Sequence, residues 1–245
     1  MSSEFFQERL EDIAREYHVG DSLDDKYFDH LFHILIADKI NSLVEPNMRI
    51  LELGYGEGTV SGKLLQLKGS QRTIIEGSDV LAQKAIKELG PDVKVVHSLF
   101  EEYDEPDSYD LVIATNVLEH VGDPKAVLER IRGWLRIGGT CVITVPNSES
   151  FHRVLAQKAG LIGSTKQLSA RDKAVGHLRV YDLGVLTAEI ISSDLEIVRT
   201  EGMVLKFLDN ASQLALPESV IRALHQLNHV YDPEVYANLY VEARK

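Results

Sequence analysis

The most constraining feature of the chain is a glycine-rich turn that directly follows a short apolar run. Residues 49–53 read Arg-Ile-Leu-Glu-Leu, and glycine then occupies positions 54, 56 and 58. Glycine at alternate positions lets the backbone take positive φ and lets a ligand approach the bare main chain. A helix that begins near Gly58 points unpaired N–H groups at the same place. The segment predicts a buried strand, a tight turn and a helix start around a nucleotide-type pocket.

The spacing of the turn separates two kinds of nucleotide. A dinucleotide fingerprint is G-x-G-x-x-G, whereas this chain has G-x-G-x-G preceded by Glu52, a carboxylate that suits an ammonium better than a pyrophosphate. A second carboxylate, Glu76, ends a predicted strand 18 residues after Gly58 (76 − 58), where it can accept hydrogen bonds from both ribose hydroxyls. Both carboxylates fit S-adenosylmethionine, whose methionine end is cationic and whose adenosine is neutral.

At these residues the chain resembles the class I S-adenosylmethionine-dependent methyltransferases. Five segments occur in the expected order: the glycine turn, residues 75–78, 109–114, 116–121 and 135–139. The last of these predicts a turn at the glycine pair 138–139 before a strand of 140–145. The resemblance implies an α/β, Rossmann-like sheet of seven strands with an antiparallel last strand, helices on both faces, an N-terminal helical cap and an insertion after strand five. Tyr55 departs from the family pattern because it is bulky, and we expect it to narrow the pocket.

Composition and continuity predict a single methyltransferase domain over residues 1–245. With 245 residues, of which 44% are hydrophobic, the chain can bury one sizeable core, and no linker interrupts it. Helical patterns at 4–16 and 25–43 form the expected cap of residues 1–45. Residues 46–146 form the cofactor-binding core, 147–182 an insertion that covers the substrate, and 183–245 the part that completes the sheet.

The charge balance points to a small-molecule substrate. The net charge of −12, with no basic run, repels nucleic-acid backbones and anionic membranes, so we expect neither partner. The single cysteine, Cys141, cannot form an intrachain disulfide, and the acidic N-terminus is unlike a signal peptide, which leads us to expect a cytoplasmic protein. We expect no metal site, and a homodimer is left open.

The resemblance implies contacts with the cofactor from the glycine turn, from the ends of strands two to four and from the N-terminal cap. Leu99 and Phe100 would supply an apolar face for adenine, Glu101 would take its amine, and Tyr17 would reach the cofactor carboxylate. Amphipathic core packing is the alternative for Tyr17 and Tyr27, and an acidic surface helix start is the alternative for Glu101. The expected cofactor-binding residues are Tyr17, Glu52, Gly54, Tyr55, Gly56, Glu76, Gly77, Ser78, Leu99, Phe100, Glu101, Asn116 and Val117.

Two histidines are candidates for a catalytic base. His120 lies one helical turn beyond Asn116, at the carboxyl edge of the sheet where open α/β folds bind ligands. With an ordinary pKa near ~6.5 it could remove a proton from the substrate. A packing or cofactor-contact role is the alternative, since a Leu-Glu-His stretch is widespread in the superfamily. His177, in the insertion, is the second candidate.

The insertion concentrates positive charge in an otherwise acidic chain. It carries His152, Arg153, Lys158, Lys166, Arg171, Lys173, His177 and Arg179. This asymmetry favours recognition of an anionic or polyhydroxylated molecule, with Arg179 as a forked donor, although a solvated cover balanced by Asp172 and Asp182 is an alternative. In an extended segment, His177, Arg179 and Tyr181 would point the same way. The expected substrate-binding residues are Tyr27, Asn147, His152, Arg153, His177, Arg179 and Tyr181.

The reaction that these features predict is in-line transfer of the sulfonium methyl group to an oxygen, or less favourably a nitrogen, of a small metabolite or sugar. The stretch from 145 to 181 resembles a bacterial subgroup that modifies sugars or secondary metabolites. No Asp/Asn-Pro-Pro-aromatic element follows strand four, which argues against nucleic-acid amino methylation. An NAD(P)-dependent oxidoreductase and a catalytically silent, cofactor-binding partner protein are the alternatives.

Overall fold

A seven-stranded sheet forms the centre of the molecule. The computed structural model describes residues 10–15, 22–64, 69–228 and 230–245. The strands lie in the order β3-β2-β1-β4-β5-β7-β6, and only β7 runs antiparallel to its neighbours, β5 and β6. This confirms the predicted sheet. The bounds are β1 Arg49–Leu53, β2 Gln71–Glu76, β3 Val93–His97, β4 Tyr109–Thr115, β5 Leu135–Pro146, β6 Glu196–Met203 and β7 Asn238–Arg244.

Helices occupy the connections between the strands, and several begin at side-chain caps. Ser22, Ser78, Asp123 and Asp182 each accept a hydrogen bond from the backbone N–H three residues on, which satisfies a donor that the first turn leaves unpaired. The bounds are α2 Leu23–Asn41, α3 Thr59–Leu64, α4 Asp79–Leu89, α5 Pro124–Trp134, α6 Phe151–Lys158, α7 Ala170–Ala174, α8 Leu183–Ser192, α9 Asn210–Leu214, α10 Glu218–Gln226 and the 3-10 helix η1 Pro233–Val235. Residues 10–15 are also helical.

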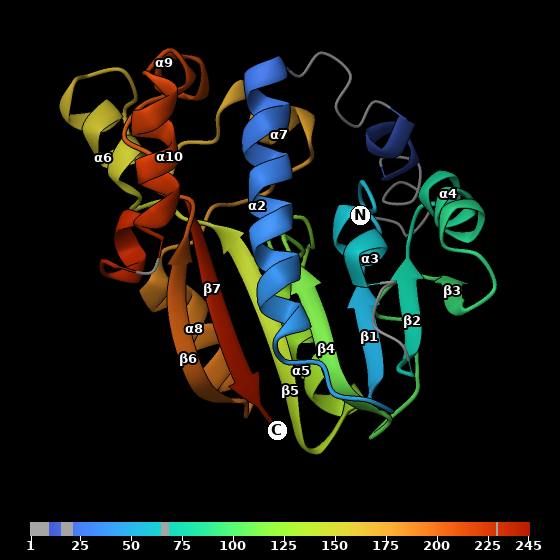
Figure 1. The fold of residues 1–245 in the computed structure, drawn as a ribbon. Helices are drawn as coiled ribbons and strands as arrows, with labels where there is room; N and C mark the ends of the chain where they lie inside the picture. The colour runs from blue at the N-terminus through green and yellow to red at the C-terminus, as the bar shows by residue number, and fades with distance from the viewer. Residues whose placement is uncertain (1–9, 16–21, 65–68, 229) are drawn as a thin grey trace.

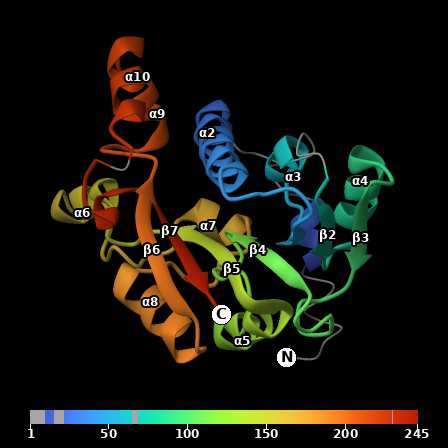
Figure 2. The same cartoon turned by 60° about the horizontal axis from the view of Figure 1, so that its bottom comes forward.

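The helices cover both faces of the sheet because successive strand residues point to opposite sides. Ile50 belongs to the buried cluster that includes Phe32 and Ile36 of α2. The next residue, Leu51, belongs to a separate cluster that includes Ile131 of α5. Figures 1 and 2 show α2, α3 and α4 on one face and α5 and α8 on the other. None of the helices that the structure describes is both long and apolar enough to cross a membrane.

The remaining helices gather beyond one edge of the sheet. In Figure 1, α6, α7, α9 and α10 lie above the arrowheads of the parallel strands, at their carboxyl ends. Two of them, α6 and α7, belong to the predicted insertion, whose helices the sequence pattern did not indicate. Ligands of open α/β sheets bind at this edge, so the topology restricts the search for a site to it.

Residues 10–15 pack over the same edge and contact both the turn after β2 and the insertion. A Cβ added at Gly77 would lie 2.8 Å from Leu10 Cδ2, and one added at Gly176 would lie 2.6 Å from Ile13 Cδ1. The Glu11 carboxylate accepts hydrogen bonds from Ser78 Oγ and from the backbone N–H at position 79, at the start of α4. This segment therefore closes over the pocket from the N-terminal side.

The structure differs from the sequence prediction at the start of β5. The glycine pair at 138–139 was predicted as a turn before a strand of 140–145, but β5 already begins at Leu135. Between Leu135 and Thr140 the register with β4 shifts, and Gly138 adopts φ 77°. The backbone of Gly138 and Gly139 hydrogen-bonds instead to Lys245. The glycines form an irregular section within one long strand.

The close packing at Gly202, in β6, generates a stability prediction. An added Cβ would lie 2.1 Å from the ring of Tyr236 and 2.7 Å from the Pro233 carbonyl oxygen. Tyr236 is fully buried and its hydroxyl is hydrogen-bonded to Leu227, so the ring has little room to move. We expect Gly202→Ala to lower the free energy of unfolding by about 1–3 kcal/mol in urea denaturation.

Gly133→Ala is the matched control for this experiment. Gly133 lies in α5, where an added Cβ meets no atom within 4 Å. Alanine at that position should leave stability unchanged or raise it by up to about 1 kcal/mol, because alanine favours a helix over glycine. Equal losses in the two variants would contradict the packing argument.

Candidate functional site

The glycine turn after β1 leaves open space beside its backbone. Gly54 and Gly56 adopt φ 76° and 54°, and a Cβ added to either would meet no atom within 4 Å. Gly58 also has positive φ, but there an added Cβ would lie 2.2 Å from Tyr55 Oη. The first two glycines thus leave room for a ligand against the main chain, whereas the third lets a side chain pack.

The ring of Tyr55, which we expected to narrow the pocket, packs into the core beside it. Its ring packs with Ile74, Ala85 and Leu89 beneath α4, and its hydroxyl donates a 2.6 Å hydrogen bond to Glu88. The ring is only 5% exposed. The bulk of Tyr55 therefore fills the space between β2 and α4, and the expectation that it narrows the pocket finds no support in this packing.

Glu76 ties the two turns of the cofactor half together. Its carboxylate accepts hydrogen bonds from the backbone N–H of Tyr55 (2.7 Å) and of Ser78 (2.8 Å). Burial raises the pKa of this carboxyl, and the backbone donors oppose the rise. Ser78 itself caps α4 through its hydroxyl. The position at the end of β2 agrees with the sequence prediction.

Glu52 faces the same pocket but is already engaged with protein groups. Its Oε1 accepts a 2.8 Å hydrogen bond from Ser61 Oγ, and its Oε2 lies 3.5 Å from the Arg72 guanidinium, itself 6% exposed. Burial raises the pKa of Glu52, and Arg72 opposes that rise. The carboxylate predicted to take the cofactor ammonium is thus neutralised by a buried arginine that the sequence analysis did not foresee.

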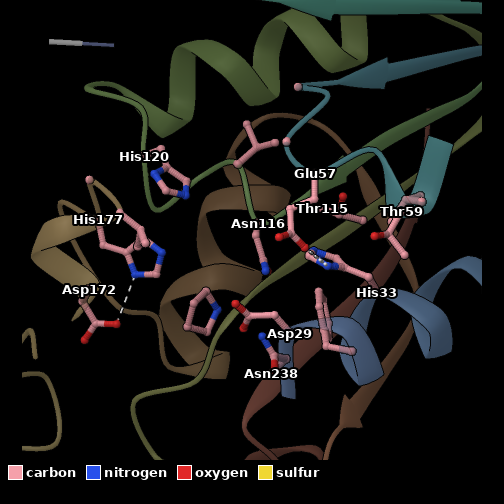
Figure 3. Close-up of a pocket in the computed structure, with 18 of the residues that line it drawn as sticks. Asp29, His33, Glu57, Thr59, Thr115, Asn116, His120, Asp172, His177 and Asn238 are labelled. Atoms are coloured by element: carbon pink, nitrogen blue, oxygen red, sulfur yellow. Dashed lines mark ion pairs between the residues drawn. The ribbon is translucent and has the colours of Figure 1, made fainter. Parts of the chain in front are cut away.

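These groups line one pocket of about 340 Å³, which also includes the residues that follow β1 and β4. Figure 3 shows side chains from several elements that point into this pocket. In this view Asn116 lies between His120 and His177 on one side and Glu57 on the other. Asn116 adopts φ 51°, a left-handed conformation that asparagine tolerates better than most residues. The predicted site residues that line the pocket are Glu52, Gly54, Tyr55, Gly56, Glu76, Phe100, Asn116, Val117, His120, Asn147, His152, Arg153 and His177.

Other predicted cofactor contacts lie beside the pocket rather than on its wall. Gly77 lies against Leu10 and Leu99, and the buried Ser78 donates a hydrogen bond to Glu11. The side chain of Glu101 is exposed, and its carbonyl oxygen accepts hydrogen bonds from Arg130. Tyr17 lies outside the described residues. Their contacts with a cofactor stay predictions.

Three predicted substrate contacts have structural roles away from the lining. Tyr27 is 40% exposed and stacks on His225, with ring centroids 6.3 Å apart. Tyr181 is 1% exposed and belongs to the main core. Arg179 donates hydrogen bonds to the carbonyl oxygens of residues 118, 121 and 122. The alternation of the segment 176–181 therefore does not gather three side chains at the substrate, because only His177 lines the pocket.

Asn147 and Arg153 line the pocket, yet their donors are engaged within the protein. Asn147 Nδ2 donates to the carbonyl oxygens of Glu234 and Tyr236, both at 2.8 Å. Arg153 donates to the carbonyl oxygens of Thr165 and Gln167. These side chains shape the walls of the pocket by joining the insertion and β5 to neighbouring segments.

One part of the pocket, which we call the acceptor half, is lined by His120, His177 and Lys206, and the sequence analysis did not single out Lys206. Lys206 follows β6, whose carboxyl end meets the same edge because β6 runs parallel to β5. Burial lowers the pKa of Lys206 to about 8, while Asp25 and Asp29 oppose the fall. Its position after a parallel strand is the one signal that could have identified it. This half is also lined by Asp29, His33, Asn210 and Asn238, and by Arg171 and Asp172 of the insertion, which the sequence analysis named for their charge.

The two predicted catalytic histidines lie side by side. The ring centroids of His120 and His177 are 4.7 Å apart, and His177 Nδ1 is 3.3 Å from an oxygen of Asp172 (Figure 3). Burial and the neighbouring His177 lower the pKa of His120 to about 3, so its imidazole is neutral and weakly basic. Although burial opposes it, the contacts of Asp172 with His177 and Ser169 hold the pKa of that carboxyl below its usual range.

Glu119, which directly precedes His120, is a buried carboxylate without a hydrogen-bond partner. The residue is 0% exposed, and neither oxygen has a partner within hydrogen-bonding distance. Burial raises the pKa of Glu119 to about 7, and His177 and Arg179 oppose the rise. The backbone around it is held firmly, since Leu178 N–H donates 2.8 Å to the Glu119 carbonyl oxygen. An unpaired buried carboxyl of this kind is costly.

Comparison with known proteins agrees with this geometry. The model of a methyltransferase-domain family matches residues 27–200. A ubiquinone biosynthesis O-methyltransferase of Xanthomonas campestris pv. campestris is 26% identical over 176 residues, which cover 69% of this chain and 72% of that protein. The protein with the same description from Aeromonas salmonicida is 34% identical over 117 residues, 46% of this chain and 48% of that protein.

Solved structures share the fold at low sequence identity. A 1,6-didemethyltoxoflavin-N1-methyltransferase of Burkholderia thailandensis, with bound 1,6-didemethyltoxoflavin and S-adenosylhomocysteine, has a TM-score of 0.63 at 16% identity and covers 100% of this chain and 91% of its own. A possible histamine N-methyltransferase of Thermotoga maritima has a TM-score of 0.62 at 18% identity, with full coverage of both chains.

The environment of Glu119 predicts a pH-dependent effect on stability. A carboxyl with a pKa of about 7 in the folded state and about 4.3 when unfolded favours folding less as pH rises between these values. Glu119→Gln removes this loss. Relative to the wild-type protein, the variant should therefore gain on the order of 3 kcal/mol in free energy of unfolding between about pH 4.5 and about pH 8.

The measurement is urea denaturation at both pH values in buffer with EDTA, so that cations do not compensate the carboxylate. Glu102→Gln, at an exposed position, is the control and should follow the wild-type protein. A constant difference between Glu119→Gln and the wild-type protein across this range would show that Glu119 titrates normally.

Proposed function

Because this chain belongs to the methyltransferase-domain family, we propose that it transfers the methyl group of S-adenosylmethionine to an oxygen of a small, anionic molecule. The protein is an S-adenosylmethionine-dependent methyltransferase. The observation that carries the proposal on the acceptor is that one pocket joins the open glycine turn and Glu76 to the histidine pair and to Lys206. Family membership sets aside the NAD(P)-dependent oxidoreductase.

The residues of the cofactor half fit S-adenosylmethionine in chemistry and space. We assign the ribose hydroxyls to Glu76, whose carboxylate has about four acceptor sites, of which the backbone N–H groups of residues 55, 77 and 78 use three. The methionine part would lie along Gly54 and Gly56, where the backbone is bare, and beside Asn116. Phe100, at the same wall, offers an apolar face for adenine. These assignments extend the sequence prediction and are proposals.

Methyl transfer needs alignment and the loss of a proton from the acceptor. The methyl group passes from sulfur to the acceptor oxygen, the sulfonium becomes a neutral thioether, and the hydroxyl proton leaves. Most of the rate enhancement would come from holding the reacting atoms in line. His120 is a weak base at a pKa of about 3. His177, with Asp172 at its Nδ1, is the better candidate to promote loss of the proton.

Two observations support an anionic acceptor with an oxygen nucleophile. The Lys206 ammonium lies in the acceptor half of the pocket, 5.1 Å from the centroid of the Phe28 ring. A partly buried cation that faces a cavity attracts a carboxylate or a similar group. The curated relatives described above are O-methyltransferases of ubiquinone biosynthesis, which favours oxygen over nitrogen.

Calorimetric titration with S-adenosylhomocysteine tests the cofactor assignment. We expect binding to the wild-type protein and at least tenfold weaker binding to Glu76→Gln, because a hydrogen bond to a charged group contributes about 1.5–3 kcal/mol. Glu102→Gln, whose side chain is exposed, should bind like the wild-type protein. Unchanged affinity in Glu76→Gln would remove Glu76 from the cofactor site.

A screen of hydroxylated carboxylic acids with labelled S-adenosylmethionine tests the acceptor class. For any acceptor found, Lys206→Met should raise KM at least tenfold, since the charge contact is lost, and should leave affinity for S-adenosylhomocysteine unchanged. Lys158→Met is the control, because Lys158 is an exposed lysine of α6. An acceptor that is neutral, or a KM insensitive to Lys206, would contradict the proposal, and binding of cofactor without any turnover would favour the silent partner protein.

A further inference from the structure

We propose that Glu119, His120 and His177 hold a divalent transition-metal ion at the wall of the acceptor pocket. This inference rests on the proposed function, since it concerns how the same site prepares its acceptor. It departs from the sequence analysis, which expected no metal. Three separate features of the structure support it: the unpartnered carboxylate, the convergence of ligand atoms, and the support of the ligands by neighbouring groups.

The first feature is the state of the Glu119 carboxylate. It is fully buried and neither of its oxygens has a hydrogen-bond partner, so no hydrogen bond replaces the water that it loses on folding. The positive charge of Arg179 acts on Glu119, but the guanidinium donates its hydrogen bonds to backbone carbonyl oxygens of the loop 118–122. A bound cation would compensate the carboxylate where no protein donor does.

The second feature is the meeting of three ligand atoms of suitable chemistry. One carboxylate oxygen of Glu119 and one ring nitrogen from each histidine all lie within 4.8 Å of one another. Two imidazoles and a carboxylate form a set that Zn²⁺ and related transition metals prefer, whereas Mg²⁺ and Ca²⁺ prefer oxygen alone. Contraction of the cluster onto an ion requires only small side-chain movements.

The third feature is the support of the ligands by residues behind them. Asp172 lies 3.3 Å from His177 Nδ1, which orients the ring and leaves Nε2 as the ligand atom. Asp172 is in turn fixed by the capping box that it forms with Ser169 at the start of α7. The backbone of His177 is anchored to Asp172 by a 2.8 Å hydrogen bond. Asp172 and His177 thus form the carboxylate–histidine part of a carboxylate–histidine–metal arrangement.

The ion would face the acceptor, because His120 and His177 line the pocket while Glu119 lies buried behind them. Three protein ligands leave coordination positions for an oxygen of the acceptor. An ion there lowers the pKa of a bound hydroxyl. In this form His177 is a ligand, the ion promotes loss of the hydroxyl proton in place of the histidine, and the proton passes to solvent water in the pocket. The transfer of the methyl group is unchanged.

Titration of the EDTA-treated, dialysed protein with Co²⁺ tests the inference. We expect visible d–d absorption that saturates at one ion per chain and disappears on addition of Zn²⁺. His177→Ala and Glu119→Gln should bind Co²⁺ at least tenfold more weakly. Asp172→Asn, a change in a positioning residue, should weaken binding by about 10- to 100-fold. His30→Ala, which removes an exposed histidine of α2, is the matched control and should bind like the wild-type protein.

The outcomes distinguish the inference from the proposed function. Titration of the same metal-free sample with S-adenosylhomocysteine measures the cofactor site independently. Cofactor binding without saturable Co²⁺ absorption would overturn the metal site, leave the methyltransferase proposal standing, and identify Glu119 as a protonated or histidine-paired carboxyl. Co²⁺ binding that survives in His177→Ala would also overturn it. If Glu119→Gln fails to fold, the Co²⁺ affinities of His177→Ala and Asp172→Asn test the site, and unchanged affinity in both would overturn it.

Discussion

The carboxylate of Glu76 is the interaction on which the ligand-binding edge depends. Parallel strands end at one edge and release backbone N–H groups there, and these groups need acceptors. Glu76 accepts from the turn after β1 and from the turn after β2, so the two turns hold a common position. The open space beside Gly54 and Gly56 exists because the turn is held from behind in this way.

A second connection brings the insertion to this edge. Arg179 and Leu178 hydrogen-bond to the backbone of the loop that carries Glu119 and His120, so His177 is brought beside His120. The arginine thus contributes to the site through the backbone that it holds. Residues 10–15 close the remaining side by packing on Gly77 and Gly176. The pocket wall consequently comes from segments that are far apart in the chain.

Charge is distributed unevenly between the surface and the pocket. The chain carries a net charge of −12, yet the cations Arg72 and Lys206 are held in its interior or at its pocket. Arg72 neutralises Glu52 within the cofactor half. Lys206 lines the acceptor half, where the negative charges of Asp25 and Asp29 stabilise its ammonium group. The acidic exterior and a cationic interior position together favour a small anion over an anionic polymer, because a polymer would meet the exterior first.

The sequence by itself determined the succession of strands along the chain, the glycine turn and the position of Glu76, whereas the seven-stranded sheet was implied by the family resemblance. These depend on local apolar runs, on glycine at fixed offsets and on a carboxylate at a strand end, all of which are visible within a few residues. It also indicated His120 and His177 as individual residues. Helices α6 and α7 were not indicated, since they are short and depend on the packing of the insertion.

Only the tertiary structure decided which of these side chains meet. Arg179 and Tyr181 share the alternation of His177, but one is drawn to backbone carbonyls and the other into the core. Glu119 and Lys206 gained importance from burial and from neighbours distant in sequence, which no local pattern records. The physical reason is that partner choice and desolvation are properties of the folded arrangement, whereas strand, turn and helix signals are properties of the chain.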